Sequence, residues 1–218
     1  MRRAQSEIKD QQQIKDIITE ATIGRMATIG ADGFPYITPV NFVYHQDKIY
    51  FHCAHKGEKI DNIRRDNKVC FEIDIPLSYL EVAFNRMNNG CKVHQLYKCV
   101  IIRGRACVVG DLETKIDALN ALVASHEGNR NFYTITPEDP LAKACSVVEI
   151  SIESISGKSD LLQERSREVQ RNTASDLANR GLPGDLDAVK AMGYELDGSP
   201  DIGWSVKDWD CYISKKVD

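Results

Sequence analysis

The chain changes from a strand to a helix within residues 51–63, FHCAHKGEKIDNI. The apolar run before this point is typical of a strand, and isoleucines then repeat at helical spacing. Gly57 and two lysines, Lys56 and Lys59, occupy the turn between the two elements. Helix N-termini present unpaired N–H groups and a partial positive charge, and glycine lets a ligand approach the backbone. The pattern predicts a phosphate site, although lysines at a helix start are also common on ordinary solvated surfaces.

Length, composition and charge limit the classes of protein to which the chain can belong. The chain has 218 residues, enough for one large domain with a buried core, and a net charge of −4. This charge argues against a nucleic-acid-binding protein, because the short basic runs are diluted by acidic residues. The chain has no apolar run of about 18 residues, as a membrane span needs, and its first seven residues, MRRAQSE, lack the apolar segment of a secretory signal. We therefore expect a cytoplasmic protein that binds neither nucleic acid nor membrane.

Seven cysteines, an odd number, are spread along the chain without a Cys-x-x-Cys pair. Most lie in apolar runs, as buried free thiols of intracellular proteins do. Cys53 and Cys91 lie in more polar settings and are candidates for reactive or metal-binding thiols. Cys91, His94 and Cys99 raise a zinc alternative, but their spacing matches no standard zinc module. We predict no metal site.

Short strand patterns at hairpin spacing dominate the chain up to residue 152. They cover residues 24–29, 36–44, 48–52, 68–74, 97–109 and 145–152. An Asp-Gly turn at residues 32–33 joins the first two, Gly104 suggests a bulge or bend, and a polar stretch at residues 77–95 interrupts the strands. Helical spacing follows Asp10, a candidate N-cap, and recurs over residues 111–125. The pattern predicts a mainly β protein, an antiparallel barrel or sandwich with peripheral helices.

The chain changes character after residue 158. The next segment is charged, poor in apolar residues and helix-like, with a break at residues 181–184, GLPG. Both tryptophans, Trp204 and Trp209, follow in a stretch whose apolar residues alternate. We expect residues 1–158 to form the main domain. Residues 159–218 would then be a helical and aromatic extension that packs on the barrel or on a partner subunit, the alternative being a loosely attached tail.

Five motifs occur in a fixed order along the first third of the chain. They are GRMAT at 24–28, DGFPY at 32–36, PVNFVY at 39–44, IYFH at 49–52 and GEKIDNI at 57–63. In order and spacing they resemble the pyridoxamine 5'-phosphate oxidase-like FMN-binding split barrels, and most closely their nitroimidazole-resistance branch. The strand at residues 97–106 matches as well, and the resemblance extends from about Ile8 to Lys158.

The resemblance implies a six-stranded antiparallel split β-barrel with flanking helices, and a homodimer with FMN at the interface. The phosphate would lie at the turn of Lys56 and Lys59, with Arg25 reaching it from the neighbouring strand, and residues 97–100 would come from the second subunit. The implied cofactor contacts are Arg25, Met26, Ala27, Thr28, Asn41, Val43, Tyr44, Phe51, His52, Cys53, Lys56, Gly57, Lys59, Asn62, Tyr97, Cys99 and Val100.

Two positions depart from the family pattern. Glu58 stands where relatives often have a basic residue, and Cys99 stands where a small hydroxyl residue is common. Glu58 weakens the positive field at the phosphate and leaves it to Lys56, Lys59 and Arg25.

Few side chains are candidates for direct chemistry. His52 is the catalytic candidate, because a histidine in a flavin cleft can donate to the ring or to the substrate, whereas the alternative is a packed or surface histidine. His55 and His94 have less support, and the tyrosines at 44, 50 and 97 fit the barrel core better than a role as acids.

The function implied is that of an FMN-dependent oxidoreductase acting on a small organic substrate such as a nitroaromatic. The flavin would carry the chemistry while the protein orients it. The alternative is a non-catalytic protein that binds FMN or haem for cofactor handling or redox sensing, since one fold supports both functions.

Overall fold

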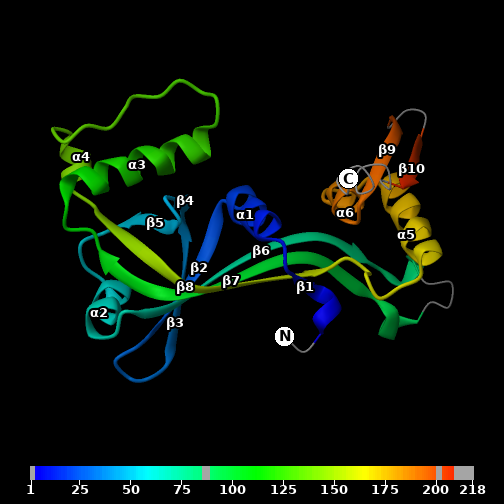
Figure 1. Ribbon diagram of the computed structural model, residues 1–218, viewed down its shortest axis with the longest axis horizontal. Helices are drawn as coiled ribbons and strands as arrows, with labels where there is room; N and C mark the ends of the chain where they lie inside the picture. Colours follow the sequence, from blue (N-terminus) through cyan, green and yellow to red (C-terminus); the bar gives the residue numbers. More distant parts are fainter. Residues whose placement is uncertain (1–2, 85–88, 200–202, 209–218) are drawn as a thin grey trace, which may run out of the picture. The chain divides into compact units, whose positions relative to one another are not determined.

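The fold is built around one curled antiparallel sheet with helices at its periphery (Figure 1). The computed structural model describes residues 3–84, 89–199 and 203–208. The sheet contains β1 (Glu7–Ile8), β2 (Ile23–Ile29), β3 (Pro35–Asn41), β4 (Val43–His45), β5 (Lys48–Cys53), β6 (Lys68–Leu80), β7 (His94–Val108) and β8 (Ser146–Asp160). Its order is β3-β2-β6-β7-β8-β5-β4, and β1 pairs with β8.

The helices and a separate hairpin complete the described chain. The α-helices are α1 (Gln11–Glu20), α2 (Glu58–Arg65), α3 (Leu112–Glu127), α4 (Pro140–Lys143), α5 (Arg167–Arg180) and α6 (Asp185–Ala191). Three short 3₁₀ turns lie at Ala4–Ser6, Val82–Phe84 and Gly90–Lys92, and the hairpin pairs β9 (Tyr194–Ser199) with β10 (Gly203–Asp208). The predicted mainly β, antiparallel class with peripheral helices is confirmed. Phe42 alone separates β3 from β4, and β1 has two residues, so the six predicted strands correspond to β2, β3 with β4, and β5 to β8.

The local signals act as the sequence indicates. The side chain of Asp10 accepts a hydrogen bond from the backbone N–H of Gln12 and caps α1. Asp111 caps α3 in the same way through the N–H of Thr114. At the β2–β3 turn, Gly33 has a φ of +84°, which favours glycine.

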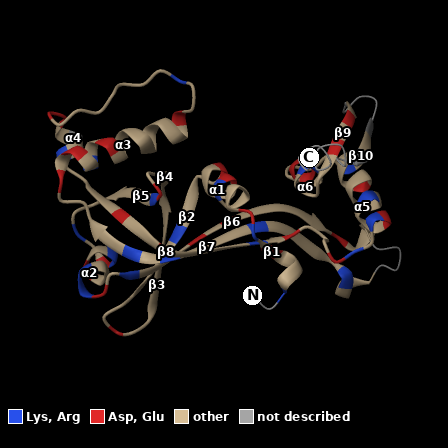
Figure 2. Cartoon of the chain, viewed as in Figure 1, with Lys and Arg blue, Asp and Glu red and all other residues tan. Residues whose placement is uncertain are grey.

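The chain divides into two compact units. The barrel unit comprises Ile8–Asp74 and Cys99–Gly157, and the extension unit comprises Met1–Glu7, Ile75–Lys98 and Lys158–Asp218. The division falls within β6, β7 and β8, so each of these strands contributes residues to both units. Acidic and basic residues are interspersed along both units (Figure 2). Among the described residues, no helix combines the length and hydrophobicity that crossing a membrane requires.

The core of the barrel unit follows the period-two alternation of its strands. On β7, Val100, Ile102 and Ala106 are buried, whereas Ile101 and Arg103 between them are exposed. A Cβ atom at Gly104 would lie 2.2 Å from the carbonyl oxygen of Ser151. The glycine predicted to mark a bulge or bend is therefore required by the close approach of β8.

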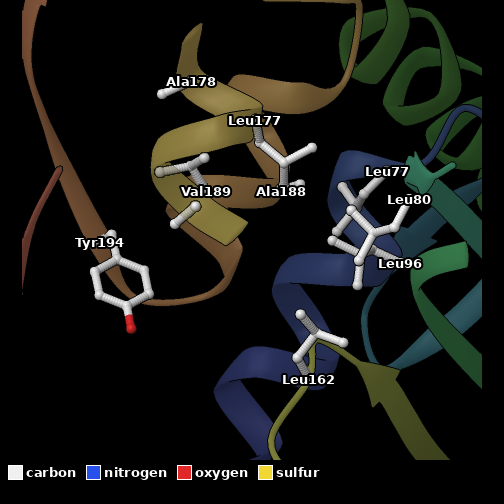
Figure 3. Close-up of a cluster of buried hydrophobic side chains, with 10 residues drawn as sticks. Leu77, Leu80, Leu96, Leu162, Leu177, Ala178, Ala188, Val189 and Tyr194 are labelled. Carbon is white, nitrogen blue, oxygen red and sulfur yellow. The ribbon is translucent and has the colours of Figure 1, made fainter. Parts of the chain in front are cut away.

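The extension unit has an apolar cluster of its own (Figure 3). From α5 and α6 it receives Ala174, Leu177, Ala178, Ala188 and Val189. In Figure 3, Leu177 and Ala188 point toward Leu77, Leu80 and Leu96, which come from β6 and β7. Leu162 and Tyr194 complete the buried set. The helix-like segment after residue 158 thus packs on strand ends, as an amphipathic segment does.

Strand ends differ from the sequence-based expectation at β6, β7 and β8, and β8 runs to Asp160 instead of ending at residue 152. The polar stretch predicted to interrupt the strands at residues 77–95 still contains the last residues of β6, to Leu80, and the first residues of β7, from His94. Leu77, Leu80 and Leu96 extend the strands because burial against α5 and α6 stabilises them there.

The helix break at residues 181–184 is confirmed. Trp204 lies on β10 opposite Gly198, whereas Trp209 lies outside the described residues.

A buried polar cluster anchors α6 within the extension unit. The carboxylate of Asp185, whose side chain is 1% exposed, accepts hydrogen bonds from the Ser78 hydroxyl at 2.6 Å and the Leu182 N–H at 2.8 Å. Arg180 donates two further bonds to it, at 2.7 and 2.9 Å. Burial alone would raise the pKa of Asp185, but these donors outweigh burial and hold its pKa below the ordinary value.

We expect Asp185→Ala to destabilise the extension unit by about 3 kcal/mol, because it removes the buried carboxylate that Arg180, Ser78 and the Leu182 N–H share and leaves Arg180 with the more exposed Glu81 as its ionic partner. Since the folded-state pKa of Asp185 is lowered, its contribution is present above the ordinary aspartate pKa and is lost as pH falls through the folded value. Urea unfolding followed by circular dichroism between pH 3 and pH 7 measures both effects. The exposed Asp187→Ala on the same helix is the control, and equal stability of the two variants would contradict the expectation.

Candidate functional site

The barrel unit contains an open cavity of about 710 Å³, a volume typical of small-molecule sites. Five segments line it: the end of β3, the end of β5 with the residue that follows, the first turn of α2, the last turns of α3, and the residues before β8. The lining residues are Pro39, Val40, Asn41, His52, Cys53, Ala54, Lys59, Leu122, Val123, His126, Glu127, Ala144 and Cys145. The structure therefore brings together four residues that the sequence predicted as cofactor contacts: Asn41, His52, Cys53 and Lys59.

The turn between β5 and α2 has the features of an anion site. Gly57 has a φ of +133°, and a Cβ atom there would meet no heavy atom within 4 Å, so the backbone is open to a ligand. α2 begins without a side-chain cap, which leaves its first amides and the positive end of its dipole exposed. Lys56 and Lys59 form no ion pair with any described residue, although Glu58 lies between them. Lys59 therefore lines the cavity, whereas Lys56 and Gly57 lie in the same turn but are not among the lining residues.

The two histidines of this segment differ in their surroundings. His52 is exposed, lines the cavity and has no hydrogen-bond partner within the part of the chain that the structure describes. His55 lies within 2.8 Å of the Ser146 hydroxyl through Nδ1 and within 3.2 Å of the Lys143 carbonyl oxygen through Nε2. His52 is therefore available to a ligand, whereas both ring nitrogens of His55 are engaged in joining the turn to the start of β8.

Cys53 ends β5 at the buried side of the cavity. Burial raises the pKa of its thiol, the positive charge of Lys59 opposes this shift, and Cys145 adds to it. The raised pKa favours the protonated thiol of Cys53 near neutral pH.

Arg25 has partners of its own on the outer face of the sheet. Its guanidinium donates to Glu72 at 3.1 Å and also bonds Asp74, both on β6. These carboxylates raise the pKa of Arg25, first through the bond with Glu72 and then through the charge of Asp74. Arg25 is not among the cavity-lining residues, and its charge is balanced by two acids.

Several predicted contacts have side chains inside the fold. The amide of Asn62 is buried, donates to the Thr28 hydroxyl at 3.0 Å and accepts from Arg65 at 2.9 Å. Met26, Val43, Phe51 and Val100 are buried in the core, and Ala27 is half-buried. These side chains stabilise the barrel, so Met26 and Thr28 have only their main chain to offer a ligand.

The predicted tyrosines and Cys99 make other contacts. The Tyr44 hydroxyl donates to Asp47 at 2.7 Å, and burial together with this bond raises the pKa of Tyr44 to about 12. The hydroxyl of Tyr97 bonds Lys158 within the extension unit. The Cys99 thiol donates to Glu72 at 3.8 Å in the barrel unit.

The part of the cavity lining that comes from α3 and from the residues before β8 was not predicted from the sequence. Leu122, Val123, His126 and Glu127 come from α3 and Cys145 precedes β8, far from the β5–α2 turn in sequence. His126 is held by the Leu122 carbonyl oxygen at 2.9 Å. No local signal marks these residues, because helical spacing identifies an apolar face without saying what it faces. Within the described ranges, no group of three or more His, Cys, Asp or Glu side chains is arranged to hold a metal ion.

A family model described as pyridoxamine 5'-phosphate oxidase matches residues 10–159. The chain therefore belongs to the pyridoxamine 5'-phosphate oxidase family, and the resemblance seen in its motifs is confirmed. No curated protein matches the chain.

Solved structures share the split-barrel fold. A Bacteroides thetaiotaomicron protein named for 5-nitroimidazole antibiotic resistance is 24% identical, with a TM-score of 0.59 over 70% of this chain and 86% of its own. An FAD and heme binding protein from Mycobacterium smegmatis (14% identity, TM-score 0.60) covers 93% of this chain and 84% of its own. The flavocytochrome Anf3 from Azotobacter vinelandii is 18% identical, with a TM-score of 0.56. This match covers 93% of this chain and 79% of that one. At these identities the likeness concerns the fold, and the predicted split barrel is confirmed.

Proposed function

We propose that the chain is a flavin-dependent oxidoreductase that holds FMN in the barrel cavity and acts on a small organic substrate such as a nitroaromatic. The observation that carries this proposal is the pair of unpaired lysines at the open Gly57 turn, beside a cavity of about 710 Å³ in a chain of this family. The names of the similar structures, for nitroimidazole resistance and for flavin binding, support the same class of activity. The division into a main domain of residues 1–158 and an extension of residues 159–218 is part of the proposal.

The donor set fits a flavin mononucleotide. Lys56, Lys59 and the first amides of α2 would hold the phosphate through charge-assisted hydrogen bonds. Asn41 and His52 supply polar groups at the cavity wall, while Pro39 and Leu122 supply apolar surface for a ring system. A bound flavin would supply two-electron transfer. His52 would donate a hydrogen bond to the ring or the substrate, and Leu122 and Val123 of α3 would limit access of water.

One observation favours the alternative cofactor. Two similar structures that cover 93% of this chain, and so extend over residues of the extension unit, are named for haem as well as flavin. A non-catalytic FMN- or haem-binding protein therefore remains the second candidate. The absorption spectrum of the purified protein separates a haem-binding protein from a flavin-binding one, because haem gives a Soret band that flavin lacks.

We expect Lys59→Ala to weaken FMN binding about 10-fold to 100-fold, and Lys56→Ala with Lys59→Ala to weaken it further, because each charge-assisted contact contributes about 1.5–3 kcal/mol. Fluorescence titration of the apo-protein with FMN gives the Kd. The matched control is Lys68→Ala, an exposed lysine of the same unit outside the cavity. Arg25→Ala should have a smaller effect, since Glu72 and Asp74 already balance its charge. Equal affinity of the double variant and the wild type would overturn the phosphate assignment.

We expect the FMN-loaded protein to lose its visible flavin absorbance when mixed anaerobically with a reduced nicotinamide nucleotide, and to regain it on addition of a nitroaromatic acceptor. His52→Ala should slow this turnover while leaving the FMN affinity within about threefold, since the phosphate contacts contribute most of the binding. Stopped-flow absorbance measures both steps. A flavin that stays oxidised with every reduced nucleotide would favour the non-catalytic alternative.

The proposal includes a homodimer. Ile23 (48% exposed), Ile29 (46%) and Ile37 (61%) lie on one face of β2 and β3, and Ile37 stands opposite Ala27. Exposed isoleucines on one sheet face are typical of a protein interface, and a two-fold axis would present this face of both copies to each other.

We expect Ile37→Asp to convert the dimer to a monomer, because it places two charges in a desolvated apolar contact. Light scattering coupled to gel filtration gives the molar mass. Leu112→Asp, at an exposed apolar position of α3, is the control and should leave the mass unchanged. A wild-type protein that is monomeric and binds FMN fully would defeat the dimer proposal.

A further inference from the structure

The turn between β5 and α2 is fixed at both of its ends. At one end, Cys53 closes β5 and stands directly opposite Ser146 of β8 in the strand register. At the other end, the carbonyl oxygen of Gly57 accepts a hydrogen bond of 2.9 Å from the N–H of Ile60, whose side chain is fully buried. Residues 54–56 lie between these two anchors, outside both elements. Their conformation therefore decides how the groups proposed to hold a phosphate are presented.

His55 attaches the middle of this turn to the start of β8. Its Nδ1 lies 2.8 Å from the Ser146 hydroxyl, and its Nε2 lies 3.2 Å from the Lys143 carbonyl oxygen. A carbonyl oxygen only accepts, so Nε2 donates, and Nδ1 of the neutral ring accepts from the Ser146 hydroxyl. Ser146 is only 7% exposed, so water does not readily replace His55 as the partner of its hydroxyl. The same residue of β8 thus anchors the turn twice, through its pairing with Cys53 and through its bond to His55.

We propose that His55 is the positioning residue of the phosphate turn. By holding residues 54–56 against the start of β8, it orients Lys56 and the backbone of Gly57 for the phosphate of FMN. The inference rests on the proposed flavin site and adds to it a residue that acts through the turn and not by contact with the ligand. This role differs from that of His52, which lines the cavity itself.

The entropy of the turn explains why such an anchor matters for binding. A turn that becomes ordered only when its ligand binds loses affinity, because ordering costs conformational entropy. Gly57 adds to that cost, since glycine has more backbone freedom than any other residue, and its φ of +133° lies in the region that favours glycine. His55 immediately precedes Lys56, so fixing His55 limits the positions that the backbone of the lysine can take. The two bonds of His55 therefore order the turn before FMN arrives.

The test compares FMN with riboflavin, which has the same ring and ribityl chain but no phosphate. We expect His55→Ala to weaken FMN binding about fivefold to tenfold, the loss that one net hydrogen bond accounts for, and to leave the Kd of riboflavin within about twofold. Fluorescence titration of the full-length apo-protein with each ligand gives both Kd values. The matched control is His45→Ala, because His45 bonds Asp117 in the same unit but lies outside the cavity.

Two further variants separate the hydrogen bonds of His55 from the bulk of its ring. His55→Asn keeps an amide that can bond the Ser146 hydroxyl, so it should recover part of the FMN affinity lost in His55→Ala. Ser146→Ala should also weaken FMN binding, and combining it with His55→Ala should add little, because both changes remove the same hydrogen bond. Fully additive losses, or an Asn variant no better than the Ala variant, would contradict the role of this bond.

The same titrations distinguish this inference from the flavin site on which it rests. A wild-type protein that binds FMN and riboflavin with equal affinity would refute the phosphate position, and the role of His55 with it. A wild-type preference for FMN that persists unchanged in His55→Ala would overturn the positioning role and leave the flavin site standing. Equal losses of FMN and riboflavin affinity in His55→Ala would also overturn it, because the change would then act on the fold and not on the phosphate turn.

Discussion

The alternation of side chains across the curled sheet is the constraint on which the rest of the structure depends. Consecutive strand residues point to opposite faces, so burying one face of each strand leaves the other free. On β5, Phe51 and Cys53 are buried, whereas His52 between them is exposed at the cavity. On β2 the same rule buries Met26 and leaves Arg25 outside, where Glu72 and Asp74 engage it. The core therefore decides which side chains can meet a ligand.

The positively charged side chains on the surface differ in whether another side chain is bonded to them. The guanidinium groups of Arg25 and Arg180 are bonded to carboxylates, and that of Arg65 is bonded to Asn62. Lys56 and Lys59 have no such partner among the described residues, although the chain has a net charge of −4. A lysine that has no carboxylate partner and lies beside a helix N-terminus can pair with an anionic ligand. This contrast is the electrostatic basis for the proposed phosphate position, and it favours the lysines over Arg25.

The long strands also explain how the helices α5 and α6 are stabilised. β6, β7 and β8 continue beyond the barrel unit, and Leu77, Leu80 and Leu96 supply the apolar surface on which α5 and α6 pack. Those helices are too polar to bury a core alone, and they need no core of their own because the strand ends provide part of it. The buried Asp185 then fixes α6 through Arg180 and Ser78. The similar structures that cover 93% of the chain share this longer arrangement at the level of the fold.

The sequence by itself determined the local elements and the family. The Asp10 and Asp111 caps, the strand alternation and the Gly57 turn each depend on residues a few positions apart, and the ordered motifs identified the split barrel. Only the tertiary structure decided that Asn62 is buried against Thr28, that α3 forms a cavity wall, and that Cys145 lines the same cavity as Cys53. Each of these arrangements brings together residues that are 34 or more positions apart in the sequence. Strand register and core packing bring them together, and both are properties of the whole chain that no local pattern encodes.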